Sequence, residues 1–91
     1  MSNKQLGIYT ERAYQHHKET EGWVCWRSAA SEGPADVTCI DKDNQYHGYQ
    51  IKRVKKHKWL SSALSKARKE AKGLPVSIQI YCCEHRLWHD Y

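Results

Sequence analysis

The sequence predicts an α/β fold, with helices and strands in the order α-β-β-β-α-β(-β). Three observations lead to this class. The chain has 91 residues, which is enough for one domain, 1–91, with a single modest hydrophobic core. Short apolar runs bounded by turn-forming residues recur along it, as expected of strands. One basic segment repeats its apolar residues at the spacing of a helix face.

The first helix is expected to run from Thr10 to about Thr20. Thr10 can serve as the N-cap, because Tyr9 and Tyr14 flank it at the spacing of a hydrophobic staple. Gly22 favours an end of the helix just before it. Residues 1–8 precede this start and are expected to be flexible.

The strands are expected in five segments, namely residues 23–26, 37–40, 46–52, 76–81 and, as a short edge strand, 87–91. A loop rich in Ser, Ala, Gly and Pro at residues 28–35 separates the first two strands. The cluster Asp41-Lys42-Asp43-Asn44-Gln45 predicts a tight turn between the second and third.

The second helix is predicted by apolar residues that recur at i, i+3, i+4, i+7 and i+11, namely Leu60, Ala63, Leu64, Ala67 and Ala71. Ser61 or Ser62 can cap its start, and Gly73 and Pro75 favour its end.

The formal net charge of +5 is concentrated in one segment. Residues 51–72 contain nine Lys or Arg and one acidic residue, Glu70, for a formal charge of +8; the rest of the chain has six basic and nine acidic residues and sums to −3. A basic block on a mildly acidic body is typical of proteins that bind a polyanion, most often DNA or RNA. The alternative is a solvated charge run that only favours solubility.

No apolar run approaches 18 residues, and the first five residues lack the apolar stretch of a secretory signal. We therefore expect no membrane span and a cytoplasmic location, in a host cell if the protein is encoded by a phage. The four cysteines are then expected to be reduced and structural. The alternative is a zinc site with irregular ligand spacing and no C-x-x-C, made by Cys82, Cys83, His85 and His89.

A polar set is predicted at the open end of the hairpin between the second and third strands. If the turn is centred on Asp43, the numbers of paired residues sum to 86 and Asp36 lies opposite Gln50. Lys52 shares the face of Gln50, and Ile51 points into the core. A slip of one residue in the register would separate these side chains.

This set fits metal-dependent cleavage of a phosphodiester. A hard cation such as Mg²⁺ binds oxygen ligands, and Asp36 offers a carboxylate, Gln50 an amide oxygen and Ile51 its main-chain carbonyl. Lys52 can hold or deprotonate the attacking water, or stabilise the charge that develops on the phosphate. In the structural alternative, Asp36 caps a turn and Lys52 is a surface lysine.

Glu11 is a further candidate ligand, acting on the metal directly or through water. Its alternative role is that of a favourable negative charge near the positive end of the first helix.

Four groups of residues together resemble the PD-(D/E)xK nuclease superfamily: Glu11-Arg12, Gly22-Trp23, Arg27-Ser28-Ala29-x-Ser31-x-Gly33-Pro34-Ala35-Asp36, and Gln50-x-Lys52. Within the superfamily, the chain is most similar to archaeal-type Holliday-junction resolvases and their small phage relatives. The similarity covers about residues 9–82. It implies a restriction-endonuclease-like domain with a central mixed sheet flanked by helices and an active site at one edge of the sheet.

The resemblance also implies roles for individual residues. Asp36 matches the metal-binding aspartate, Lys52 the lysine, and Glu11 the glutamate near the metal. Family members hydrolyse DNA phosphodiesters with Mg²⁺ or Mn²⁺, and the resolvases act on branched DNA as homodimers.

By the same resemblance, Arg12 and Arg27 match residues that contact the DNA backbone. Ser28 and Ser31 match a mobile loop that reaches the scissile phosphate. The basic block adds four candidate contacts to the DNA backbone, namely Arg53, Lys55, Lys56 and Lys58.

One departure from the family pattern concerns Gln50, which stands at the second acidic position. The glutamine removes one negative charge, so we expect one metal ion rather than two, and weaker metal binding. The leading prediction is a metal-dependent DNA endonuclease, selective for branched structures. The alternatives are a non-catalytic DNA-binding module with a decayed site, or a nicking, homing or restriction endonuclease that acts on duplex DNA.

Overall fold

The computed structural model describes residues 2–28 and 35–91; the predicted loop residue Ser31 lies outside this part of the chain. Its elements follow the predicted order, which confirms the fold class. They are α1 (Asn3–Glu19), β1 (Val24–Arg27), β2 (Val37–Ile40), β3 (Tyr46–Val54), the 3₁₀ helix η1 (His57–Trp59), α2 (Leu60–Glu70), β4 (Ser77–Cys82) and β5 (Leu87–Asp90).

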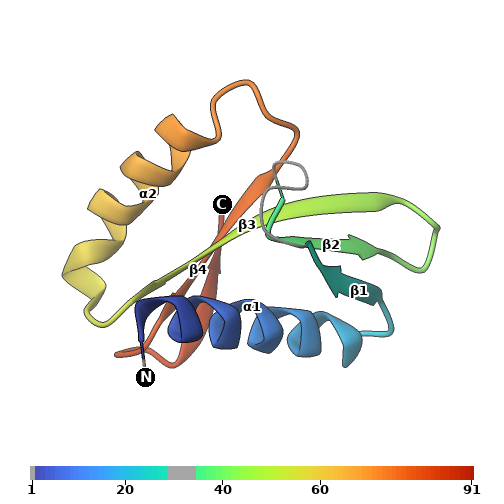
Figure 1. Cartoon of the computed structure of the whole chain (residues 1–91), viewed down its shortest axis with the longest axis horizontal. Helices are drawn as coiled ribbons and strands as arrows, with labels where there is room; N and C mark the ends of the chain where they lie inside the picture. The colour runs from blue at the N-terminus through green and yellow to red at the C-terminus, as the bar shows by residue number, and fades with distance from the viewer. Residues whose placement is uncertain (1, 29–34) are drawn as a thin grey trace.

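The five strands form one mixed sheet in the order β1-β2-β3-β4-β5. All neighbours are antiparallel except β3 and β4, which are parallel and are connected through η1 and α2. The two helices lie on opposite sides of the sheet, with α1 below it and α2 above it in Figure 1. Neither α1 nor α2 is long and apolar enough to cross a membrane.

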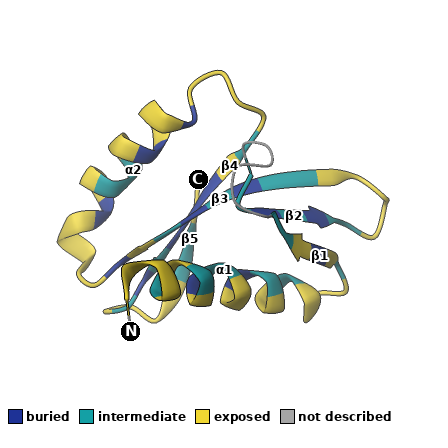
Figure 2. Ribbon diagram, in the orientation of Figure 1, coloured by how far each residue is buried: buried dark blue, intermediate teal, exposed yellow. Residues whose placement is uncertain are grey.

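Each face of the sheet has its own hydrophobic core. The core under α1 is made by Tyr14, Cys25, Val37, Cys39, Tyr49 and Ile51. The core under α2 is made by Val54, Leu60, Ala67, Ile78, Ile80 and Cys82. Figure 2 shows both helices exposed on their outer sides and buried toward the sheet. Because side chains alternate along a strand, Gln50 and Lys52 belong to the α2 side and Tyr49 and Ile51 to the α1 side.

The first helix starts seven residues before the predicted N-cap, so residues 3–8, which were expected to precede the helix, are part of it. Ser2 and Gln5 form a capping box: the Gln5 N–H donates to Ser2 Oγ at 3.1 Å, and the Ser2 N–H donates to Gln5 Oε1 at 3.0 Å. Thr10 is buried within the helix, and its hydroxyl donates to the Leu6 carbonyl. The predicted helix end is confirmed, since Gly22 adopts a φ of 89° just beyond it.

The second helix packs with its predicted apolar face, but its predicted cap is wrong. Neither Ser61 nor Ser62 caps it; Trp59 occupies the N-cap position without a side-chain hydrogen bond. The preceding turn η1 leads directly into α2, so the chain is already wound before the serines are reached.

The expectation that all four cysteines are reduced is also wrong. Cys25 and Cys39 pair directly across β1 and β2 and form a disulfide. The register explains this, because side chains of directly paired residues lie on the same face of the sheet. Cys82 and Cys83 are free.

Candidate active site

The hairpin between β2 and β3 has the predicted register. Val37 pairs with Tyr49 and Ile40 with Tyr46, so the numbers of paired residues sum to 86. The turn is stabilised by Asp41, whose Oδ1 accepts the N–H groups of Asp43 at 2.8 Å and Gln45 at 3.0 Å. This local chemistry explains why the register was predictable from the turn residues alone.

Three predicted site residues form a row across neighbouring strands. Asp36 directly precedes β2 and lies at the position opposite Gln50. The Ser28 N–H donates to the Asp36 carbonyl at 3.0 Å, which extends the pairing of β1 and β2 by one residue. Ser28, Asp36 and Gln50 therefore occupy one row on the α2 side of the sheet.

The Asp36 side chain is fixed by β3. Its Oδ2 accepts the Ile51 N–H at 2.9 Å, and its own N–H donates to the Tyr49 carbonyl at 2.9 Å. Tyr49 is paired with Val37, so this bond from the Asp36 N–H departs from regular pairing. Among the described residues, none donates a hydrogen bond to the other carboxylate oxygen of Asp36.

The segment Ala35–Asp36 lies close to β3, and the small residue Gly48 leaves room for this contact. A Cβ atom added at Gly48 would lie 3.3 Å from the Ala35 Cβ and 3.4 Å from the Pro75 carbonyl oxygen. Glycine at this position therefore lets the chain reach Asp36 while staying close to β3.

The Gln50 side chain supplies the most informative atom of the site. Its Oε1 is buried, and within residues 2–28 and 35–91 it has no hydrogen-bond partner. A buried amide oxygen without a donor costs about 1–3 kcal/mol. A cation at this position would satisfy it.

The main-chain carbonyl of Ile51 faces the same edge. The N–H and C=O of one strand residue point to the same side of the strand, and the Ile51 N–H points to Asp36. The Asp36 carboxylate, the Gln50 amide oxygen and the Ile51 carbonyl thus belong to neighbouring positions at the open end of the β2–β3 hairpin, and such a donor set would suit a hard cation such as Mg²⁺ or Mn²⁺.

Lys52 shares the face of Gln50 but is paired with another residue. Its Nζ donates to Glu70 Oε2 at 3.0 Å, and both side chains are partly exposed. The hydrogen bond from Lys52 and its positive charge lower the pKa of Glu70. The sequence prediction missed Glu70, although it is the one acidic residue of the basic block.

Glu11 lies on the other side of the sheet. Its Oε1 accepts a hydrogen bond from Arg27 Nε at 3.0 Å, and Arg27 pairs with Val37, a residue of the α1-side core. No ion pair or hydrogen bond among the described residues joins Glu11 to Asp36 or Lys52. The alternative role near the helix start is wrong, because α1 begins at Asn3 and its first turn contains no acidic residue.

The residues predicted to contact DNA do not all lie on one face of the sheet. Lys55, Lys56 and Lys58 are exposed between β3 and α2. Arg12 is exposed on α1, and Arg53 lies on the α1 side with its guanidinium carbon 5.4 Å from the centre of the Tyr81 ring.

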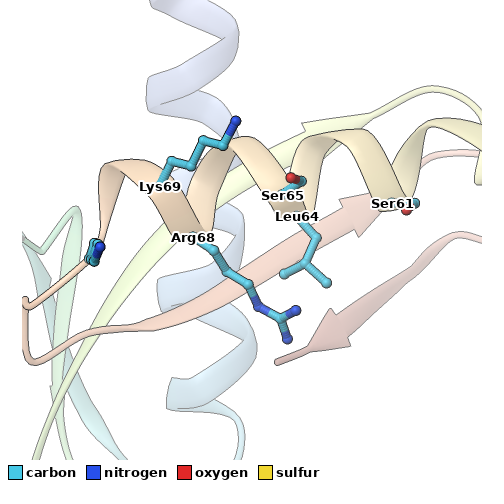
Figure 3. Close-up of a pocket in the computed structure, with 6 residues that line it drawn as sticks. Ser61, Leu64, Ser65, Arg68 and Lys69 are labelled. Atoms are coloured by element: carbon cyan, nitrogen blue, oxygen red, sulfur yellow. The ribbon is translucent and has the colours of Figure 1, made fainter.

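The outer surface of α2 continues the basic region. An open hollow along the helix is lined by Ser61, Ser65, Arg68, Lys69 and Lys72, and by Leu64, which also packs against the α2-side core. In Figure 3, Leu64 and Arg68 extend from one side of the helix and Lys69 from the other. Cations and hydroxyl groups on one exposed surface suit contacts with phosphate groups.

Comparison with known proteins found no matching family, no matching curated protein and no matching solved structure.

Proposed function

We propose that the protein is a metal-dependent DNA endonuclease whose single Mg²⁺ or Mn²⁺ is held by Asp36, Gln50 and the Ile51 carbonyl. The observation that carries this proposal is the buried Gln50 Oε1, which has no partner among the described residues and lies in one row with the Asp36 carboxylate. A single carboxylate favours one ion over two, because two ions need more negative charge than Asp36 provides.

The proposed chemistry assigns a role to each side chain. The bound ion would polarise the phosphate and make a neighbouring water more acidic. Asp36 neutralises part of the positive charge, and its hydrogen bond from the Ile51 N–H fixes its orientation. Gln50 contributes a neutral oxygen. Lys52 holds the water or the phosphate, for which it exchanges its contact with Glu70.

The proposed substrate is DNA, bound through the exposed lysines between β3 and α2 and through the basic outer surface of α2. Selectivity for branched DNA and action as a homodimer belong to the same proposal, and their support is the resemblance of the Arg27–Asp36 string to the resolvases.

A second candidate function is a DNA-binding module without catalysis. The observation that favours it is that two of the four predicted catalytic residues are engaged elsewhere, Glu11 with Arg27 and Lys52 with Glu70. The two candidates differ in one measurable property, which is strand cleavage.

The deciding experiment incubates labelled four-way junctions and linear duplexes with the protein across a Mg²⁺ series. The informative variant is Asp36→Asn, since asparagine keeps an acceptor for the Ile51 N–H but removes the charge. Asp43→Asn is the matched control, because Asp43 is an exposed aspartate in the turn of the same hairpin. We expect wild type and Asp43→Asn to cut DNA with Mg²⁺, and Asp36→Asn to bind DNA without cutting it.

Two results would contradict the proposal. DNA binding without cleavage under Mg²⁺ or Mn²⁺ would establish the binding module instead. Equal cleavage by wild type and Asp36→Asn would show that the activity comes from another site or from a contaminant.

A further inference from the structure

A second group of potential metal ligands lies at the hairpin between β4 and β5. The Cys82 sulfur and imidazole nitrogens of His85 and His89 all lie within 4.8 Å of one another. These residues lie on β4, on β5 and in the turn between them, and their donor atoms are nitrogen and sulfur rather than oxygen. The site proposed for Mg²⁺ uses none of them.

The fold explains why the three residues meet. Cys82 pairs with Leu87, and Ile80 pairs with His89, so Cys82 and His89 are diagonal neighbours on the α2 side of the sheet. The intervening turn is closed by a hydrogen bond from the Arg86 N–H to the Cys82 carbonyl at 2.8 Å, with Arg86 at a φ of 54°. This turn carries His85 back to the other two ligands.

The three residues differ in burial, so that an ion held by them would be enclosed by the protein on one side and reachable from solvent on the other. Cys82 is fully buried and is not part of a disulfide. His89 Nε2 is buried and, among the residues that the structure describes, has no hydrogen-bond partner. His85 is exposed and leaves the group open to solvent on one side. A cation would thus satisfy a buried nitrogen that now lacks a partner.

The ligand chemistry selects the ion. One thiolate and two imidazoles are typical of Zn²⁺ sites, whereas Mg²⁺ prefers oxygen. The order of the ligands in the chain is C-x₂-H-x₃-H, a compact spacing that a single hairpin can bring together. A third imidazole is near, because the His57 ring centre lies 4.5 Å from that of His85. The main-chain N–H of His57 donates to Glu84 Oε1 at 2.9 Å.

We propose that Cys82, His85 and His89 supply three of the four ligands of a Zn²⁺ ion that fastens the β4–β5 hairpin to the α2-side core. An ion that binds the folded chain and not the unfolded one raises the unfolding temperature. This proposal does not depend on nuclease activity.

The test uses the chain without a histidine tag, stripped of metal with a chelator and with the Cys25–Cys39 disulfide intact. Zn²⁺ affinity is measured by competition with a chromogenic chelator, and thiolate ligation by the charge-transfer absorption of bound Co²⁺. We expect one Zn²⁺ per chain, a thiolate–Co²⁺ band and a higher unfolding temperature with Zn²⁺ than without it.

The variants separate this site from other thiols and imidazoles. We expect His85→Asn to weaken Zn²⁺ binding by more than roughly tenfold, and this exposed position carries little risk to folding. Cys82→Ser should remove the Co²⁺ charge-transfer band. Cys83→Ser and His16→Asn are matched controls, since Cys83 is the other free cysteine and His16 is exposed on α1.

The proposal is overturned if wild type binds Zn²⁺ no better than His85→Asn, or if Cys83→Ser removes the thiolate band while Cys82→Ser keeps it. Circular dichroism of each metal-free variant checks that the fold is kept. Asp36→Asn should bind Zn²⁺ like wild type, which keeps the outcome for this site separate from the outcome for the nuclease site.

Discussion

Gln50 is the residue on which the proposed nuclease site depends most. Gln50 lies between Asp36, which directly precedes one neighbouring strand, and Ile78 of the α2-side core on the other. Its buried Oε1 has no hydrogen-bond partner among the described residues. A neutral ligand gives a weaker site than a carboxylate, because it contributes no charge to balance the ion.

This assignment predicts that Gln50→Glu binds Mg²⁺ roughly tenfold more tightly, because the variant adds one negative charge to the same position. Isothermal titration calorimetry measures the affinity, and Gln45→Glu supplies the matched control with the same charge change in the exposed turn of the hairpin. A Gln50→Glu variant that binds Mg²⁺ no better than the control would remove Gln50 from the ligand set.

Tyr14 provides a second test at the residue scale. Its hydroxyl is buried without a hydrogen-bond partner among the described residues, and burial raises the pKa of the phenol well above its ordinary value. Because the folded state keeps this proton and the unfolded state releases it above about pH 10, the free energy of unfolding should fall as the pH rises beyond that value.

Tyr14→Phe removes the unpartnered hydroxyl while keeping the ring in the core. At pH 7 we expect its stability to be unchanged or higher by up to about 1 kcal/mol, and its loss of stability above about pH 10 to be smaller than that of wild type. Urea unfolding at both pH values measures this, with Tyr91→Phe as an exposed control. A loss of more than about 1 kcal/mol at pH 7 would show that the hydroxyl has a partner.

At the scale of elements, the start of α1 depends on its capping box. Ser2→Ala removes the acceptor of the Gln5 N–H, so we expect the free energy of unfolding to fall by about 1 kcal/mol. Ser65→Ala, on the exposed surface of α2, should be nearly neutral. Chemical denaturation measures the stability of both variants. Equal stability of Ser2→Ala and wild type would mean that the capping box contributes nothing to the stability of the fold.

The connection between β3 and α2 carries the second prediction at this scale. The double variant Lys55→Gln/Lys56→Gln should weaken DNA binding and lower the slope of log affinity against log salt by roughly 0.9 for each phosphate that the protein no longer neutralises. Lys4→Gln/Lys42→Gln is a control of equal charge on exposed positions outside the basic block. Fluorescence anisotropy across a salt series measures both, and equal slopes in the two variants would contradict a DNA surface at this connection.

For the whole molecule, the sequence alone predicted correctly those features that depend on interactions between residues close together in the chain. The turn at Asp41–Gln45 sets the hairpin register, which in turn places Asp36 opposite Gln50. The apolar spacing of residues 60–71 likewise identified the buried face of α2. The capping box of α1 is also local, and the Ser-x-x-Gln pattern that begins at Ser2 is a sequence signal that could have placed the helix start correctly.

Interactions between residues that are far apart in the sequence account for the other differences between prediction and structure. Glu11 binds Arg27 because α1 packs against β1 and β2, and the ion pair of Lys52 with Glu70 depends on where the crossover places α2. The Cys25–Cys39 disulfide required the pairing of β1 with β2, which spacing along the chain does not specify. The C-x₂-H-x₃-H spacing was visible, but without the β4–β5 pairing it gave no reason to exclude Cys83.

The proposed nuclease site holds one divalent ion between Asp36, Gln50 and the Ile51 carbonyl. The clearest test is a titration of the isotope-labelled protein with Mn²⁺, followed by NMR, in the presence of one equivalent of Zn²⁺ so that Mn²⁺ does not bind to the thiol and imidazole groups. Paramagnetic broadening should appear first at the amide signals of residues 36, 50 and 51 and should be absent in Asp36→Asn. Broadening that begins elsewhere, or that is the same in Asp36→Asn, would show that Asp36, Gln50 and the Ile51 carbonyl do not hold the ion.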